Sequence, residues 1–122
     1  MELSKVQVFM VEDDEIGQLA VGMLLKSLGV MTIDIAATGR EAIDMVEKKE
    51  YDIYLIDIGL PDIEGFEVMK KICELYGKDS EIYALTGHSE EIYKINSLKC
   101  GAKDLITKPL TPERFQKIAD AL

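Results

Sequence analysis

The feature that most constrains the fold is a short apolar run followed by a helical pattern, repeated five times. The apolar runs fall at residues 6–11, 32–36, 53–56, 82–85 and 105–107. Neighbouring parallel strands need a crossover connection, which is usually a helix, so this alternation predicts a parallel sheet covered by helices on both faces. The 122 residues are enough for one core. We therefore expect an α/β fold, a doubly wound sheet of five strands with five helices, in one domain over residues 1–122.

The first predicted helix, which begins near residue 16, is apolar on more than one face. Six apolar residues recur at helical spacing and are expected to pack on the sheet: Ile16, Leu19, Ala20, Met23, Leu24 and Leu28. Val21 and Leu25, one turn apart, are then expected on the exposed face. Single exposed apolar side chains are common. This pair is therefore either an ordinary surface feature or a docking surface for a partner helix.

Capping signals mark the starts of the other four helices. Thr38 opens a capping box, and Pro61 with Asp62 is expected to begin the third helix. Ser89 is expected to cap the fourth helix. Thr111 is expected to cap the fifth, because a proline follows it at the first helical position.

Polar side chains follow four of the five predicted strands, at the point where each strand ends. They are Glu12, Asp13 and Asp14 after the first strand, Asp57 after the third, Thr86 after the fourth and Lys108 after the fifth. The carboxyl ends of parallel strands meet at one edge of the sheet, where ligands bind in open α/β folds, so these groups are expected to lie together. Acids, a hydroxyl and an ammonium group in one place are typical of a phosphoryl-transfer site.

A divalent cation completes this predicted site. Two carboxylates about 4 Å apart repel each other by roughly 4 kcal/mol at an effective dielectric constant near 20. Glu12, Asp13 and Asp57 would therefore destabilise the domain if nothing offset their charge. Mg²⁺ binds oxygen ligands, keeps several waters and commonly uses carboxylates together with a phosphate oxygen. Lys108 supplies a second compensating charge, and Thr86 can donate a hydrogen bond to an incoming oxygen.

The composition argues against several classes of partner. The 23 acidic and 14 basic residues give a net charge of −9, which argues against nucleic acid because no cluster of Lys and Arg is available for the phosphates. No apolar run is long enough to span a bilayer, and no secretory signal begins the chain, so we expect a cytoplasmic domain without membrane contact. The two cysteines match neither a metal-binding spacing nor a disulfide framework.

Four motifs together resemble the receiver domain of bacterial two-component and phosphorelay response regulators. They are Val11-Glu12-Asp13-Asp14, Asp57 with Leu60-Pro61-Asp62 and Gly65, Ala84-Leu85-Thr86, and Lys108-Pro109. The resemblance covers essentially the whole chain, and the motifs follow the family's order and spacing. It implies the flavodoxin-like receiver fold with strand order 2-1-3-4-5, an order that the repeat alone does not give.

The resemblance also implies how a phosphoryl group would be accepted. Asp57 would take it from a phosphohistidine on a histidine kinase or a histidine phosphotransfer domain, forming an acyl phosphate. Mg²⁺ would be the cofactor, held by Asp13, Asp57 and the backbone carbonyl of Gly59, with Glu12 acting through a bound water. Metal ions in such sites bridge and neutralise phosphate oxygens.

The expected conformational switch departs from the family pattern. Lys108 would pair with the phosphoryl group while Thr86 moves toward it. Leu105 stands where many receivers have a Tyr or Phe that rotates inward with the switch, so the aromatic part of the switch is absent at this position. Gly59 and His88, the only histidine, occupy positions at which the family tunes hydrolysis of the acyl phosphate. For His88, an ordinary loop residue is the alternative.

Residues 11–29, 84–86 and 108–110 look most like the receivers of hybrid sensor histidine kinases. In those receivers the first helix docks a histidine phosphotransfer domain, which would give Val21 and Leu25 a role. Such a domain is not a turnover enzyme by itself, although it catalyses its own phosphorylation and dephosphorylation and belongs to a histidine kinase polypeptide. It is expected to be monomeric before phosphorylation.

Other functions match parts of the pattern. A stand-alone single-domain response regulator is the nearest alternative to a hybrid kinase. A Mg²⁺-dependent phosphatase with an aspartyl nucleophile needs a general acid two residues later, where this chain has Gly59. A flavin mononucleotide module has a similar architecture, but the acids at residues 12–15 repel phosphate unless a cation intervenes. A receiver that binds partners without being phosphorylated is a further alternative.

Overall fold

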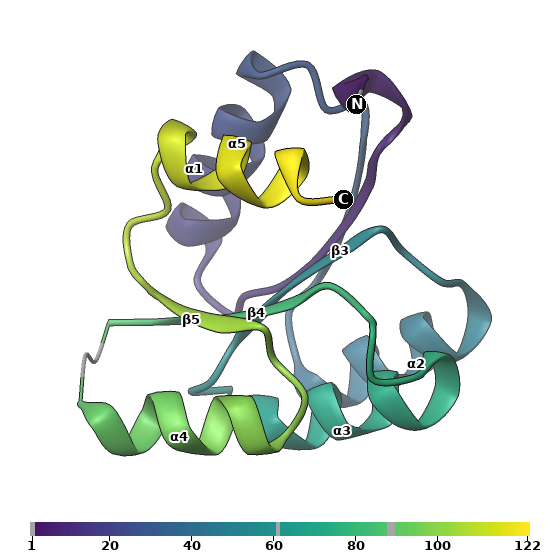
Figure 1. The fold of residues 1–122 in the computed structure, drawn as a ribbon, viewed down its shortest axis with the longest axis vertical. Coiled ribbons are helices and arrows are strands. Elements are labelled where there is room, and N and C mark those ends of the chain that lie inside the picture. Colours follow the sequence, from purple (N-terminus) through teal and green to yellow (C-terminus); the bar gives the residue numbers. More distant parts are fainter. Residues whose placement is uncertain (1, 61, 88–89) are drawn as a thin grey trace.

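A five-stranded parallel sheet runs through the molecule (Figure 1). The structure is a computed structural model, and it describes residues 2–60, 62–87 and 90–122. The predictions for Pro61, His88 and Ser89 therefore fall outside the described residues. The strands are β1 (Gln7–Val11), β2 (Thr32–Ala36), β3 (Ile53–Asp57), β4 (Ile82–Thr86) and β5 (Asp104–Thr107). The helices are α1 (Glu15–Ser27), α2 (Gly39–Lys48), α3 (Gly65–Tyr76), α4 (Glu91–Lys99) and α5 (Pro112–Asp120), after a short 3-10 turn at Leu3–Lys5. The strand order β2-β1-β3-β4-β5, with every neighbouring pair parallel, confirms the predicted doubly wound sheet.

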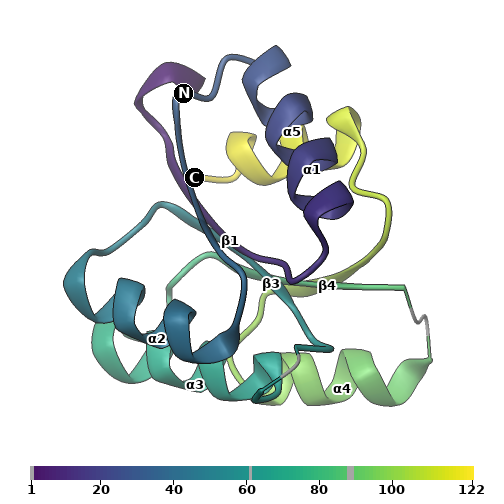
Figure 2. The ribbon, with the colours of Figure 1, turned by 180° about the vertical axis from the view of Figure 1, so that it is seen from behind.

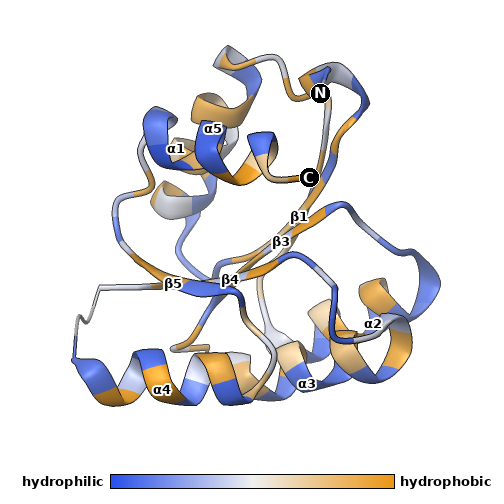
Figure 3. Cartoon of the chain, in the orientation of Figure 1, coloured by the Kyte–Doolittle hydropathy of each residue, from blue (hydrophilic) through white to orange (hydrophobic). Residues whose placement is uncertain are grey.

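The helices form two layers, one on each face of the sheet. Helices α1 and α5 cover one face, and α2, α3 and α4 cover the other (Figures 1 and 2). Successive side chains of a strand point to opposite faces, so Val8 of β1 enters the core under α1 and α5, whereas Phe9 enters the core under α2 and α3. The helices alternate hydrophobic with hydrophilic residues (Figure 3). None of the described helices has the length and apolar character needed to cross a membrane.

Helix α1 packs on the sheet with a different face from the one that we predicted. Leu25 is fully buried, and the half-buried Val21 packs against the same core. In contrast, Ile16, Leu19 and Met23 are 78%, 64% and 62% exposed. Of the six residues predicted to pack on the sheet, those in contact with this core are Leu24 and Leu28. The prediction was wrong because two faces of the helix carry apolar residues at helical spacing, and periodicity alone does not choose between them.

Two of the predicted helix caps are present, and one predicted helix start is wrong. The side chains of Thr38 and Thr111 accept hydrogen bonds from backbone N–H groups three residues later, at 3.1 and 3.2 Å. Helix α3 begins at Gly65, so Asp62 does not start this helix as predicted. The reason is that the carboxylate of Asp62 accepts its hydrogen bonds from α2 instead of opening α3.

An aromatic cluster fills the core at the beginning of β3. The ring centroids of Phe9, Tyr51 and Tyr54 lie between 5.0 and 6.2 Å apart. The hydroxyl of Tyr54 accepts a hydrogen bond from the backbone N–H of Tyr51 at 2.9 Å. Burial disfavours the ionised form and raises the pKa of Tyr54 to about 12. Burial and the neighbouring carboxylate of Glu81 likewise raise the pKa of Tyr83 in β4 to about 12.

The free energy of unfolding is expected to fall between about pH 10 and pH 12. Tyrosines in the unfolded chain ionise near pH 10, while Tyr54 and Tyr83 hold their protons to about pH 12 when folded. The unfolded state then binds fewer protons, so each tyrosine lowers stability by between about 2 and 3 kcal/mol as the pH rises through this range. Urea unfolding followed by circular dichroism at each pH measures the loss. Burial also raises the pKa of Tyr51, so three tyrosines contribute to the slope. Tyr83→Phe should reduce the slope by about a third, and an unchanged slope would contradict the assignment.

Candidate functional site

The carboxyl ends of the strands bring together the polar side chains that follow them in the sequence. Glu12 comes directly after β1, Asp57 and Thr86 are the last residues of β3 and β4, and Lys108 comes directly after β5. Glu12, Asp57 and Thr86 are buried although they are polar, and Asp13 beside them is exposed. The structure thus gathers these groups at one edge of the sheet.

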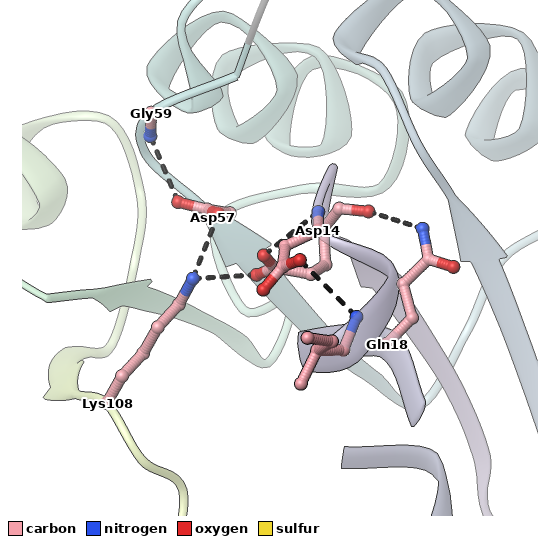
Figure 4. Close-up of polar contacts among 7 residues, drawn as sticks. Asp14, Gln18, Asp57, Gly59 and Lys108 are labelled. Atoms are coloured by element: carbon pink, nitrogen blue, oxygen red, sulfur yellow. Dashed lines mark hydrogen bonds and ion pairs between the residues drawn. The ribbon is translucent and has the colours of Figure 1, made fainter. Parts of the chain in front are cut away.

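Lys108 links two of the buried carboxylates. Its Nζ donates a hydrogen bond to Glu12 Oε2 at 2.7 Å and another to Asp57 Oδ2 at 3.0 Å (Figure 4). The side chains of Glu12 and Asp57 are only 4% and 9% exposed, and that of Lys108 is 35% exposed. Water and salt screen charges weakly at such low exposure, so the charges interact strongly here.

One ammonium group does not balance the carboxylates of this site. Burial raises the pKa of Glu12 above its usual value, and the hydrogen bond from Lys108 only partly opposes this effect, while nearby Asp57 adds to it. Burial acts to lower the pKa of Lys108, but the hydrogen bonds to Glu12 and Asp57 outweigh it and the pKa is raised. The negative charge on Glu12 is therefore unfavourable even beside Lys108, and a further cation would relieve it.

Three carboxylates of this site can each give one ligand atom to a metal ion. One oxygen each from Glu12, Asp13 and Asp57 lie within 4.8 Å of one another, and no other group of three such residues occurs in the part of the chain that the structure describes. Oxygen ligands suit Mg²⁺ better than a softer metal. Gly59, whose carbonyl is the remaining predicted ligand, is exposed beside them, and its N–H donates to Asp57 Oδ1 at 3.0 Å (Figure 4). These residues fit a Mg²⁺ ion.

The two predicted switch positions lie on neighbouring strands. The side chain of Thr86 is buried, and its carbonyl accepts a hydrogen bond from the backbone N–H of Lys108 at 2.7 Å. Leu105 in β5 is half-buried against the core under α2, α3 and α4. Thr86 also lines a pocket of about 310 Å³ together with Tyr93 of α4. An aromatic ring is thus present near Thr86, but α4 provides it in place of β5.

Two residues of α1 shape the surroundings of Glu12, and neither role was predicted from the sequence. The side-chain amide of Gln18 donates a hydrogen bond to the backbone carbonyl of Glu12 at 2.7 Å (Figure 4). A Cβ at Gly17 would lie 3.1 Å from the carboxyl group of Glu12, so glycine leaves room for that side chain. A glycine inside a helix is unfavourable by about 1 kcal/mol relative to alanine. That cost was the one sequence signal of a close approach.

Known proteins resemble this chain over almost its full length. Residues 8–120 match the family model described as the response regulator receiver domain. The chain is 33% identical over 113 residues to the aerobic respiration control sensor protein ArcB of Escherichia coli, covering 91% of this chain and 14% of ArcB. It is 31% identical over 111 residues to the transcriptional regulatory protein CreB of Escherichia coli, covering 90% of this chain and 47% of CreB. The chain therefore spans about half or less of the length of these relatives.

Solved structures agree with the sequence relatives. The chemotaxis protein CheY4 of Vibrio cholerae has a TM-score of 0.85 at 27% identity, covering 95% of this chain and 97% of that one. The receiver domain of the sensor histidine kinase PA1611 from Pseudomonas aeruginosa, with a magnesium ion in its active site cleft, has a TM-score of 0.84 at 28% identity, covering 95% of each chain. The family match, the strand order and the acidic site confirm the resemblance, and the chain belongs to the response regulator receiver domains of two-component signalling.

Proposed function

We propose that Asp57 accepts a phosphoryl group from a phosphohistidine of a partner protein and that this modification switches the conformation of the domain. A carboxylate oxygen of Asp57 forms the new bond to phosphorus while the phosphorus–nitrogen bond of the donor breaks. The imidazole of the donor leaves and takes up a proton. The observation that carries this proposal is the buried Asp57 carboxylate, which lies beside Lys108 and within an acidic group suited to a divalent cation.

The contacts of Asp57 hold its carboxylate in one orientation. Oδ1 accepts a hydrogen bond from the N–H of Gly59 and Oδ2 accepts one from Lys108. Positioning and charge neutralisation supply most of the catalysis in phosphoryl transfer, so a fixed carboxylate is what the reaction requires. Lys108 is already in place to pair with phosphoryl oxygens, and Thr86 can donate a hydrogen bond to one of them.

Mg²⁺ would be held by Asp13, Asp57 and the carbonyl of Gly59, with Glu12 acting through a water, and it would neutralise charge on the phosphoryl oxygens. The modified Asp57 carries close to two negative charges, in place of the single charge of the free carboxylate. The phosphoryl group is then a stronger partner for Lys108 than Glu12 is. A hydrogen bond from Thr86 to a phosphoryl oxygen biases the end of β4 toward a second conformation.

An exposed apolar face of α1 supports docking of the donor next to the site. This face consists of Ile16, Leu19 and Met23. It takes the place of the predicted pair, of which Leu25 is buried and Val21 is half-buried. Leu19 and Met23 line a groove of about 530 Å³ between α1 and β2, where Ile33 and Ile35 add further apolar surface. An amphipathic helix that carries the donor histidine could lay its apolar side in this groove.

We place the domain within a hybrid sensor histidine kinase. The identity with the sensor protein ArcB and the likeness to the receiver domain of PA1611 support this context. A stand-alone response regulator is the second candidate, favoured by the match to 97% of CheY4. Phosphotransfer assays separate the two, because a hybrid receiver should pass its phosphoryl group rapidly and reversibly to a histidine phosphotransfer domain, whereas a stand-alone regulator should receive it directly from a kinase.

Incubation of the protein with acetyl phosphate and Mg²⁺ tests the proposed chemistry. Mass spectrometry should show one added phosphoryl group at Asp57, and hydroxylamine should remove it because it cleaves acyl phosphates. Chelation of the metal with EDTA should prevent the addition. No addition in Mg²⁺, or addition at another residue, would contradict the proposal. Multiple turnovers of p-nitrophenyl phosphate would support the phosphatase alternative instead.

A further inference from the structure

Asp62 lies on the loop between β3 and α3, and its side chain accepts hydrogen bonds from the start of α2. Its Oδ1 accepts a hydrogen bond from the N–H of Gly39 at 2.8 Å, and its Oδ2 accepts one from the N–H of Arg40 at 2.9 Å. The Arg40 side chain also lies 3.8 Å from Oδ2, but it is 81% exposed and adds little. A carboxylate at a helix N-terminus is stabilised by free N–H groups and by the helix dipole. The loop is therefore fastened to α2.

Helix α2 has a local cap as well, so Asp62 is not needed to begin it. The hydroxyl of Thr38 accepts a hydrogen bond from the N–H of Glu41 at 3.1 Å. Although burial acts to raise the pKa of Asp62, the hydrogen bonds from Arg40 and Gly39 outweigh it and hold the pKa below its usual value. Asp62 is thus a second cap, ionised at neutral pH, and it comes from a segment 23 residues away.

Close packing accompanies these hydrogen bonds. A Cβ at Gly39 would lie 2.2 Å from Cγ1 of Ile63, so glycine is required for the loop to approach α2 this closely. At the other end of the loop, the N–H of Gly65 donates to the carbonyl of Ile58 at 3.0 Å. The loop is held at two places, and Gly59 lies within it.

We propose that Asp62 is a positioning residue that fixes Gly59 for metal binding at Asp57. This inference rests on the proposed function, in which the carbonyl of Gly59 is a ligand of Mg²⁺. A Cβ at Gly59 would meet nothing within 4 Å, so packing does not fix this residue. The orientation of its backbone depends on the hydrogen bond to Asp57 and on how the rest of the loop is held. The hydrogen bonds from Gly39 and Arg40 hold the loop at Asp62, three residues after Gly59. Without them, the loop gains freedom that metal binding must remove, and the affinity for Mg²⁺ falls.

Asp62→Ala and Thr38→Ala form a matched pair of variants. Each removes one cap of α2, but the first alone releases the loop, so both should lower Tm by about 3 to 6 °C. Asp62→Ala alone should raise the Kd for Mg²⁺ about tenfold in isothermal titration calorimetry. Asp62→Asn keeps one acceptor oxygen and should fall between the wild type and Asp62→Ala. If Asp62→Ala does not fold, Asp62→Asn carries the same comparison with Thr38→Ala.

Two measurements separate positioning from a general loss of stability. At saturating Mg²⁺, phosphorylation of Asp62→Ala by acetyl phosphate should return to within about twofold of the wild-type rate, since the reacting groups are intact. In the metal-free protein, the amide of Gly65 should exchange with deuterium faster in Asp62→Ala than in Thr38→Ala.

The outcomes distinguish this inference from the proposed function. Wild-type Mg²⁺ affinity in Asp62→Ala, or an equal loss of affinity in Thr38→Ala, would overturn the positioning role while the proposed function stands. A wild-type protein that neither binds Mg²⁺ nor takes up a phosphoryl group would overturn the proposed function itself.

Discussion

Replacement of Asp57 by asparagine is expected to abolish phosphoryl uptake from acetyl phosphate. The asparagine amide has nearly the same shape as the carboxylate, and its oxygen can still accept the hydrogen bond that Gly59 donates at 3.0 Å. The amide nitrogen that replaces Oδ2 cannot accept the hydrogen bond from Lys108, so that bond is lost, and a neutral amide does not form the bond to phosphorus. Mass spectrometry of the variant after incubation with acetyl phosphate and Mg²⁺ should show no added phosphoryl group.

The same substitution is expected to stabilise the protein when metal is absent. It leaves Glu12 and Lys108 as a balanced pair at 2.7 Å and reduces the repulsion among the three carboxylates. We expect the free energy of unfolding in EDTA to rise by about 1 kcal/mol, and the stabilisation by added Mg²⁺ to shrink. The matched control is Asp44→Asn, at an exposed position in α2, which should change neither quantity.

Opposite results would point elsewhere. Wild-type phosphorylation of the asparagine variant would show that another residue accepts the phosphoryl group. Lower stability of this variant in EDTA would show that the charge on Asp57 is favourable in the metal-free site, and that repulsion among the carboxylates is not what Mg²⁺ relieves.

Gly65→Ala is expected to destabilise the protein by about 3 kcal/mol or more. A Cβ at this position would lie 2.2 Å from the backbone oxygen of Asp57 and 3.0 Å from Cα of Ile58. Both neighbours are backbone atoms, so neither can rotate away, and the start of α3 must move away from the end of β3. Urea unfolding of the variant and the wild type measures the loss.

Gly22→Ala is the matched control, because it makes the same chemical change in α1. A Cβ at Gly22 would meet nothing within 4 Å, so this variant should be about 0.5 to 1 kcal/mol more stable than the wild type. Gly65→Ala should also weaken Mg²⁺ binding, since a shifted β3–α3 junction moves Asp57, whereas Gly22→Ala should not. Equal stability of the two variants would contradict the close contact between α3 and β3.

The strands and the residues after them were predictable because both follow from local patterns. Strand β3 is buried on both faces, and such a strand reads as an unbroken apolar run. A polar residue directly after such a run, as at Glu12, must lie at the sheet edge, and parallel strands place all these edges on one side. The order of the strands depends on which crossovers are made, and it came from the family resemblance.

The buried face of α1 and the role of Asp62 could not be predicted from the sequence, for two different physical reasons. Leu25 and Leu19 are both apolar at helical spacing, and the choice between them is made by how the helix packs on the sheet. Asp62 follows a proline, a common local signal for a helix start, but its hydrogen-bond donors are in α2, 22 and 23 residues earlier. A contact of that kind exists only once distant segments have packed together.

The bond between Lys108 and Glu12 joins positions that are 96 residues apart, almost the two ends of the chain. A ribosome adds about 5 to 20 residues per second, so on the order of 10 s of translation separate these two residues. Until Lys108 has been added, Glu12 and Asp57 lack the ammonium group that binds them in the folded protein. A product released before β5 is made would therefore keep both acids and lack their ammonium partner.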